Sequence, residues 1–170
     1  MAKILITGGT GLIGQHLQRF LTSAGHEIHV LSRSKTGNIN GVQYWNWDIE
    51  KQYIDENALK VDHIIHLAGA GVMDEKWTNK RKSVLIDSRV KSFELLYKTI
   101  QAKNIQLKSF VSASAVGFYG NQGNKVLHEE SNKGNDFLAK VCNEWEKTAH
   151  LMRNEMPFPV ATIRIGIVLS

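Results

Sequence analysis

A glycine-rich segment near the N-terminus has the composition of a phosphate-binding turn. Residues 7–14 read Thr-Gly-Gly-Thr-Gly-Leu-Ile-Gly, between a short apolar run and a stretch with helical periodicity. Gly8 permits a tight turn out of a strand, Gly11 lets the backbone approach a pyrophosphate, and Gly14 lets the helix pack closely on the strand. The unpaired N–H groups at the start of that helix favour an anion. We therefore expect a dinucleotide to contact the turn, through Gly8, Thr10, Gly11, Leu12 and Ile13.

The residues at the end of the second predicted strand bear on the choice between NADP and NAD. Proteins that bind NAD usually place an acidic side chain there, which holds the ribose 2′-hydroxyl. This sequence has Ser32, Arg33, Ser34 and Lys35 instead. An arginine can pair with a 2′-phosphate, and no carboxylate stands there to repel one. The segment favours NADP over NAD, with Ser32 and Arg33 as contacts. The alternative is that Arg33 is a solvated surface residue.

Strand-like and helix-like stretches alternate along the whole chain. This alternation predicts an α/β fold with a doubly wound parallel sheet of the Rossmann type, in the strand order 3-2-1-4-5-6, and we assign residues 1–170 to this one domain. Residues 36–41 and 114–133 are predicted loops. The predicted strands are residues 3–7, 27–32, 42–47, 62–67, 107–111 and 159–165, and the predicted helices are residues 12–24, 55–60, the later half of 74–103, and 136–153.

Composition and charge narrow the function classes. The chain has 170 residues, of which 42% are hydrophobic and 22% charged, as in ordinary globular domains. No apolar run approaches the ~20 residues of a membrane helix, and no signal peptide is recognisable, so we expect no membrane partner. The single cysteine, Cys142, favours a reducing compartment, the cytoplasm. The net charge of +5 is spread out and the histidines are scattered, so we expect neither a nucleic-acid partner nor a metal site.

Motifs along the chain resemble the extended short-chain dehydrogenase/reductases, the branch of sugar-nucleotide epimerases and dehydratases. The glycine-rich turn is shared with that superfamily, whose strand ends carry further matching motifs. The resemblance implies that Asp48, after the third strand, contacts adenine. It also implies that the loop after the fourth strand lines the cofactor, through Leu67, Ala68, Gly69 and Ala70.

A more specific resemblance is to an atypical bacterial subgroup known only as epimerase-family proteins. It is carried by Trp77-Thr78, by Asp87-Ser88-Arg89-Val90, by residues 136–139 and by Trp145-Glu146. Members are similar in binding NADP(H), which implies that Arg89 contacts the cofactor, and they carry a C-terminal domain. Because this sequence ends soon after the sixth predicted strand, we expect that substrate domain to be absent from this chain. We also expect the chain alone to have little catalytic activity.

The acid/base pair of the superfamily, a tyrosine followed four positions later by a lysine, is missing. No tyrosine in this sequence precedes a lysine by four positions. When Glu146 is aligned with the family's glutamate, Leu138 stands at the tyrosine position and Cys142 at the lysine position. Neither side chain can replace a phenol whose pKa is lowered from ~10 by a fixed ammonium group. An alignment that uses Lys140 puts Asp136 at the tyrosine position, so the usual mechanism cannot be carried over.

Other side chains are candidates for chemistry. The resemblance places Ser114 where the family keeps its catalytic serine or threonine. Tyr119 is the nearest phenol in the sequence and a candidate acid, although a structural ring in the loop is the stronger interpretation. Arg81 and Arg89, with Trp77, could bind an anionic substrate, or they could form a basic helix face exposed to water.

These residues favour an NADP-dependent oxidoreductase or epimerase-like enzyme with a non-standard acid/base group. Its expected partner is a small-molecule substrate, such as a sugar nucleotide or another carbonyl compound. The missing tyrosine and lysine keep a second interpretation open, an NADP(H)-binding sensor or scaffold without turnover. Apolar surface expected near the sixth strand would also allow self-association into a homo-oligomer.

Overall fold

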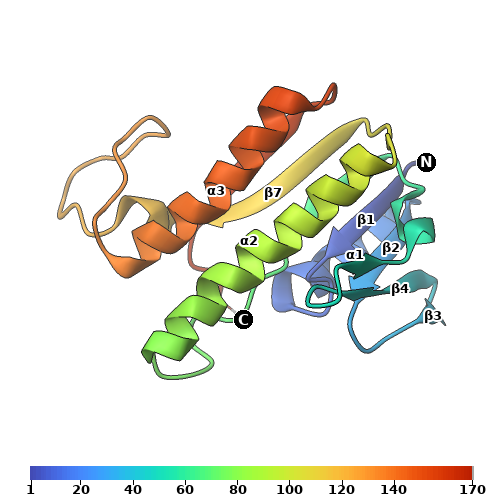
Figure 1. Cartoon of the computed structure of the whole chain (residues 1–170), viewed down its shortest axis with the longest axis horizontal. Coiled ribbons are helices and arrows are strands. Elements are labelled where there is room, and N and C mark those ends of the chain that lie inside the picture. Colours follow the sequence, from blue (N-terminus) through green and yellow to red (C-terminus); the bar gives the residue numbers. More distant parts are fainter. Residues whose placement is uncertain (170) are drawn as a thin grey trace.

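A parallel sheet forms the body of the molecule (Figure 1), and the computed structural model describes residues 1–169. Its parallel strands lie in the order β4-β2-β1-β6-β7-β8, which is 3-2-1-4-5-6 in chain order, so the predicted Rossmann-type α/β fold is confirmed. The strand order reverses between β1 and β6, where sheets of this kind leave a crevice for a ligand. The strands are β1 (Lys3–Thr7), β2 (Glu27–Ser32), β4 (Val42–Asp48), β6 (His63–His66), β7 (Ser109–Ala115) and β8 (Val160–Ile165).

Helices cover both faces of the sheet, which explains why its strands are short continuous apolar runs. Side chains alternate along β1: Ile4 and Ile6 pack on the α1 side, whereas Leu5 joins a larger cluster with Phe93 of α2 and Trp145 of α3. Helices α2 and α3 lie side by side on that second face (Figure 1). The helices are α1 (Leu12–Ser23), α2 (Asn79–Ala102) and α3 (Phe137–Glu155), with the short 3-10 turns η1 (Glu56–Leu59) and η2 (Val116–Tyr119).

The prediction that residues 36–41 form a loop was wrong. Strand β3 (Gly37–Ile39) pairs antiparallel with β4, and Asn40 and Gly41 join the two strands. Their φ angles are 53° and 81°, the left-handed conformations in which an Asn-Gly pair closes a two-residue hairpin. A strand of three residues is too short to show a period of two, so only the turn marked it. A second short strand, β5 (Tyr53–Ile54), also pairs antiparallel with β4.

The strand predicted at residues 107–111 lies further along the chain. Strand β7 extends to Ala115, so Ser112 and Ser114 belong to the strand and not to the loop that follows it. In the register of the sheet, Ser114 stands opposite Arg164 of β8. This shift places the serine-rich stretch at the carboxyl end of the sheet, beside the crevice.

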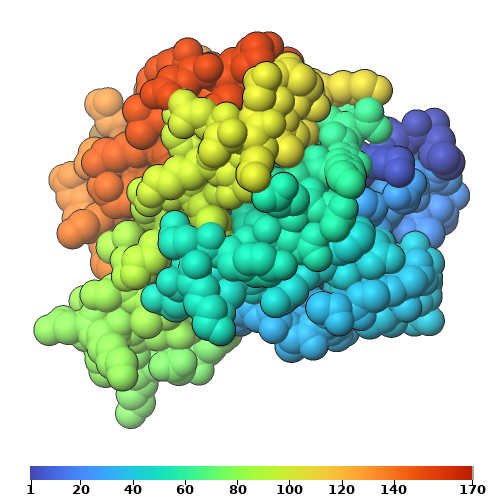
Figure 2. Space-filling model, turned by 45° about the vertical axis from the view of Figure 1, so that its right-hand side comes forward, coloured from blue at the N-terminus to red at the C-terminus, as the bar shows by residue number. Residues whose placement is uncertain are grey.

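The segment that precedes α2 projects from the body of the molecule, as the green protrusion in Figure 2 shows. Met73 is 88% exposed there and Trp77 40% exposed. None of the helices within residues 1–169 combines the length and the apolar composition that are needed to cross a membrane.

Candidate functional site

The glycine-rich turn between β1 and α1 is packed too tightly for side chains. Gly8 has a φ of +66°, and a Cβ added there would lie 2.8 Å from the backbone carbonyl carbon of Leu67. A Cβ on Gly9 would lie 2.7 Å from Val30, and one on Gly14 would collide with the carbonyl oxygen of Gly8. The three glycines are therefore required by the close approach of β2, β6 and α1 to the turn. Gly11 is less crowded, since the nearest atom to a Cβ there, the Gly8 carbonyl oxygen, would be 3.3 Å away.

Two buried polar side chains stabilise this turn by hydrogen bonds from the interior of the protein. The amide of Gln18 in α1 donates hydrogen bonds to the carbonyl oxygens of Gly9 and Gly14. The hydroxyl of Tyr44, on β4, donates in turn to Gln18 Oε1 over 2.8 Å. Gln18 is only 6% exposed, so this chain of hydrogen bonds fixes the turn from the interior of the protein.

The N-terminal end of α1 presents its backbone N–H groups without competition from a side chain. Gly11 is the capping residue and makes no side-chain cap hydrogen bond, and the first turn of the helix contains no acidic residue. Leu12 and Ile13 begin the helix, and the first N–H groups of a helix have no partner within it. The positive end of the helix dipole adds to the same field. This end of the crevice is therefore suited to a phosphate group.

A buried threonine and histidine join the turn to the loop after β6. The backbone N–H groups of Leu67 and Ala68 both donate to Thr7 Oγ1 over 3.2 Å. Because the Thr7 oxygen accepts these two bonds, its hydroxyl group donates a hydrogen bond to His66 Nδ1, over 2.8 Å. The His66 ring then carries its proton on Nε2, which faces Ser92 Oγ at 3.4 Å. Complete burial lowers the pKa of His66 to about 3, so the ring is neutral.

The residues predicted to read the 2′-position, Ser32 and Arg33, lie at the end of β2 and differ in exposure. Ser32 is buried and its hydroxyl accepts hydrogen bonds from the backbone N–H groups of Ser34 and Lys35. This turn leaves Arg33 exposed to solvent. The predicted adenine contact, Asp48, lies at the end of β4, where hydrogen bonds and the charge of Lys51 lower the pKa of its carboxyl group. The structure thus brings Ser32, Arg33 and Asp48 to one side of the crevice.

The loop after β6 forms the other wall of the crevice and is held by α2. The Ala70 N–H donates to Ser88 Oγ over 3.0 Å. Gly69 lies against the side chain of Arg89, where an added Cβ would be 3.0 Å from the guanidinium carbon. The Arg89 guanidinium also stacks on the ring of Trp145, with 5.1 Å between the guanidinium carbon and the ring centroid.

The positions aligned with the missing tyrosine and lysine lie in the first turns of α3. Asp136 caps this helix by accepting from the Ala139 N–H over 2.8 Å. Leu138 and Cys142, four residues apart in the helix, lie about one turn from each other. Cys142 is buried, and desolvation raises the pKa of its thiol. A protonated, buried thiol cannot replace a fixed ammonium group.

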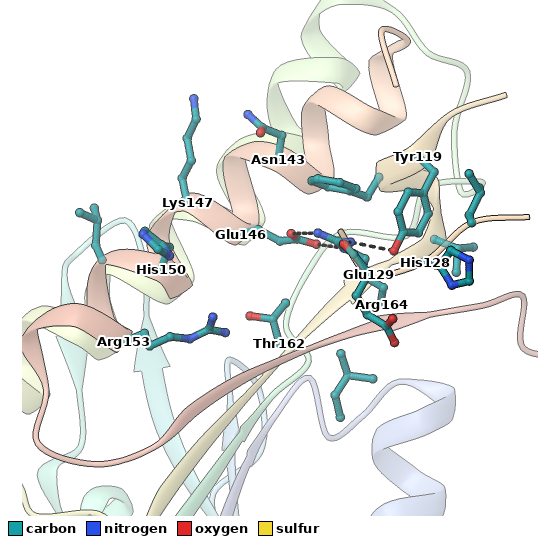
Figure 3. A pocket seen from close by; sticks show the side chains of 15 residues that line it. Tyr119, His128, Glu129, Asn143, Glu146, Lys147, His150, Arg153, Thr162 and Arg164 are labelled. Atoms are coloured by element: carbon teal, nitrogen blue, oxygen red, sulfur yellow. Dashed lines mark hydrogen bonds and ion pairs between the residues drawn. The ribbon is translucent and has the colours of Figure 1, made fainter. Parts of the chain in front are cut away.

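The two predicted catalytic residues meet at one ion pair, shown in Figure 3. Ser114 Oγ donates to Glu146 Oε1 over 2.6 Å. Arg164 binds both carboxylate oxygens of Glu146, at 2.9 and 2.8 Å, and its Nη1 donates to the Tyr119 hydroxyl oxygen over 2.7 Å. Hydrogen bonding to Glu146 raises the pKa of Arg164, so the guanidinium group stays protonated. Ser114 and Tyr119 therefore share a network, and their contact with a substrate stays a prediction.

This ion pair lines a groove of about 1060 Å³ between α3, η2 and β8. His128, Lys147 and His150 also lie on its rim (Figure 3). Among residues 1–169, no three His, Cys, Asp or Glu side chains are grouped closely enough to hold a metal ion.

Arg81 and Trp77 have structural contacts that the sequence did not indicate. Arg81 is 8% exposed, and its guanidinium donates to the Gly71 carbonyl oxygen over 2.6 Å and to Glu75 over 3.0 Å. It is therefore no part of an exposed basic helix face. Trp77 donates to the Val72 carbonyl oxygen and makes an edge contact with Phe137. Both side chains fix the projecting segment that precedes α2.

Sequence reasoning missed the residues that hold the crevice together, above all Gln18, Tyr44 and His66. Each belongs to an ordinary amphipathic pattern, and its partner lies on a different element. The one available signal in the sequence was the presence of a polar residue, His66, at the end of an apolar strand. Arg164, in β8, carried no signal of its pairing with Glu146, because the two residues belong to different elements.

Comparison with known proteins agrees with this geometry. The sequence model of the NAD dependent epimerase/dehydratase family matches residues 4–163. The epimerase family protein YfhF of Bacillus subtilis is 32% identical over 99% of this chain and 55% of its own length. A crystal structure of a nucleoside-diphosphate sugar epimerase from Corynebacterium glutamicum is 34% identical, with a TM-score of 0.80, over 99% of this chain and 34% of that one.

A second solved structure, human epimerase family protein SDR39U1 with NADPH, is 26% identical with a TM-score of 0.81, over 99% of this chain and 55% of that one. The chain thus spans about half the length of the curated relatives that it matches. Its fold, its glycine-rich turn and the family match over residues 4–163 lead to one conclusion: the chain belongs to the NAD dependent epimerase/dehydratase family.

Proposed function

We propose that this chain is the NADP(H)-binding part of an epimerase/dehydratase-like protein. The observation that carries the proposal is the glycine-rich turn, where side chains are excluded at Gly8, Gly9 and Gly14 and where no side chain caps the N-terminal end of α1. A dinucleotide pyrophosphate fits such a cradle because backbone N–H groups and the helix dipole stabilise its charge. The human relative solved with NADPH supports the same assignment.

The preference for NADP over NAD rests on the end of β2. Arg33 is exposed there, and the Ser32 turn aims residues 33–35 outward at the mouth of the crevice. A guanidinium group can bind a 2′-phosphate through two hydrogen bonds, whereas NAD offers only a hydroxyl. Asp48 remains available on the neighbouring strand for the adenine amino group.

When bound, the nicotinamide group supplies hydride transfer, so we propose an oxidoreductase or epimerase-like reaction on a small molecule, such as a sugar nucleotide or another carbonyl compound. The Corynebacterium relative named a nucleoside-diphosphate sugar epimerase supports this substrate class. A cytoplasmic setting agrees with the single buried cysteine, Cys142. A second candidate, a cofactor-loaded sensor without turnover, is favoured by Leu138 and Cys142 at the acid/base positions.

Calorimetric titration with NADPH and with NADH tests the proposal. We expect NADPH to bind more tightly, and Arg33→Gln to weaken NADPH by about tenfold to a hundredfold, because a charge-assisted hydrogen bond contributes ~1.5–3 kcal/mol. NADH affinity should change little. Arg19→Gln, on the exposed face of α1, is the matched control. Tighter binding of NADH would refute the NADP preference, and binding of neither nucleotide would refute the function.

Turnover separates the two candidates. Hydride transfer between the bound cofactor and any member of a panel of carbonyl compounds and sugar nucleotides would exclude the sensor. Because this chain spans about half the length of its relatives, the panel is tested on the full-length protein. If that protein binds NADPH but oxidises or reduces no member of the panel, the enzyme interpretation fails.

A further inference from the structure

The missing lysine raises the question of which cation, if any, faces the nicotinamide half of the cofactor. The helix that would carry the lysine, α3, has Cys142 at that position. Helix α2 runs alongside α3, and its Arg89 reaches across to Trp145 of α3. Arg89 and Cys142 influence each other's pKa, as neighbouring groups do. A cation from α2 therefore occupies the surroundings of the vacant lysine position.

The topology of the sheet decides which half of a dinucleotide Arg89 would meet. The pyrophosphate belongs at the turn after β1, and the adenosine ribose belongs at the end of β2. The other half must then cross the point where the strand order reverses and lie over the ends of β6 and β7. Arg89 touches Gly69, in the loop after β6, so it stands on this nicotinamide side. Arg33 stands on the opposite side, at the end of β2.

The Arg89 side chain is held firmly, yet most of its donors are free. Its Nη1 donates to the Leu85 carbonyl oxygen over 2.9 Å, which is its one hydrogen bond to the protein among residues 1–169. The Trp145 ring and the backbone of Gly69 confine the guanidinium plane. Its Nε and Nη2 atoms make no hydrogen bond within residues 1–169, and the residue is only partly buried, so these donors are available to a ligand.

The electrostatic environment of Arg89 favours a ligand rich in oxygen acceptors. Burial and the nearby charge of Arg81 lower its pKa, but an arginine stays protonated at neutral pH. A partly desolvated cation with a single carbonyl partner has lost hydration that protein groups have not replaced. Ribose hydroxyl oxygens that approach it would restore those hydrogen bonds.

We propose that Arg89 binds the ribose hydroxyl groups of the nicotinamide half of NADP(H) and supplies there the positive charge that a lysine at position 142 would supply. The Trp145 ring, on which the guanidinium stacks, restricts its movement. The inference rests on the proposed function and adds to it a residue from a different helix, with an assignment to one half of the cofactor.

Two ligands separate the halves of the cofactor experimentally. NADPH contains the nicotinamide ribose, whereas adenosine 2′,5′-bisphosphate contains only the adenosine side with its 2′-phosphate. We expect Arg89→Gln to weaken NADPH by about tenfold or more, the loss of a charge-assisted hydrogen bond, and to leave the bisphosphate affinity unchanged. Arg33→Gln should weaken both ligands. Lys91→Gln, on the exposed side of the same helix, is the matched control.

The outcomes are distinguishable. Unchanged NADPH affinity in Arg89→Gln, or an equal loss for both ligands, would overturn the inference while the proposed function stands. Failure of the unaltered chain to bind NADPH would overturn the proposed function itself. Thermal melting identifies a variant that does not fold, and in that case Arg89→Lys replaces it. Lysine keeps the charge but loses the planar fork, so we expect it to weaken NADPH selectively, and an equal loss for both ligands would again contradict the inference.

Discussion

Acidification should destabilise this protein through His66, whose hydrogen bond to Thr7 helps to join the glycine-rich turn to the loop after β6. The ring is fully buried, its Nδ1 accepts the Thr7 proton, and its edge packs on Phe93. Its pKa is lowered from 6.5 to about 3 by desolvation. The folded state therefore excludes a proton that the unfolded chain binds below pH ~6.5. Stability that is present above this pH is lost progressively as the pH falls toward about 3.

The size of this effect follows from the shift. Each pH unit below ~6.5 costs about 1.4 kcal/mol, so at pH ~5 the free energy of unfolding should be lower by ~2 kcal/mol from His66 alone. That is a substantial part of the ~5–15 kcal/mol that stabilises a typical domain. Protonation would also place two donors face to face, at Thr7 and at the ring, and so loosen the link between the glycine-rich turn and the loop after β6.

Urea denaturation of the chain and of His66→Asn, each at pH ~7.5 and pH ~5, measures the contribution. Asparagine keeps an acceptor for Thr7 but does not titrate. The variant should be less stable at the higher pH, because it leaves a cavity beside Phe93, yet it should lose ~2 kcal/mol less on acidification. Every other titrating group is common to both proteins. The same loss in both would show that His66 is not the buried neutral base described here.

Three further outcomes follow from particular contacts. Gly14→Ala should abolish NADPH binding and lower the melting temperature, because its Cβ would strike the turn, whereas Gly166→Ala should change neither. Glu146→Gln should destabilise the protein by ~2 kcal/mol in denaturant titration, since it leaves the Arg164 cation poorly paired. Cys142 should react slowly with an alkylating reagent at neutral pH and become accessible only in denaturant, because burial raises its pKa.

The sequence predicted the sheet because its information there is local. Each parallel strand is a short apolar run, each helix has its own period, and the glycine-rich turn fixes which strand stands at the centre. The hairpin at β3 escaped because three residues cannot display a period, although Asn40 and Gly41 carried the signal of its turn. Element boundaries shifted for a similar reason: the small residues that extend β7 to Ala115 lack strand character of their own.

The supports of the candidate site could not be predicted, because they join elements that are distant in the chain. Gln18 and Tyr44 are 26 residues apart, and Thr7 and His66 are 59 apart. Nothing in either local pattern marks the pairing. The residues expected to touch a ligand were easier to predict, since a glycine-rich turn and an arginine at a strand end follow directly from the chemistry of phosphate binding.

A position in an alignment specifies less than the hydrogen bonds around it. The resemblance to the family predicts a catalytic hydroxyl at Ser114, but a serine has one proton, and here Glu146 accepts it. A substrate oxygen could receive that proton only after Glu146 gives up the bond, which the pairing of Glu146 with Arg164 opposes by fixing the carboxylate in place. The serine oxygen can still accept a hydrogen bond from a substrate hydroxyl in the meantime. Direction of donation, and not residue type, therefore decides what a hydroxyl at this position can do.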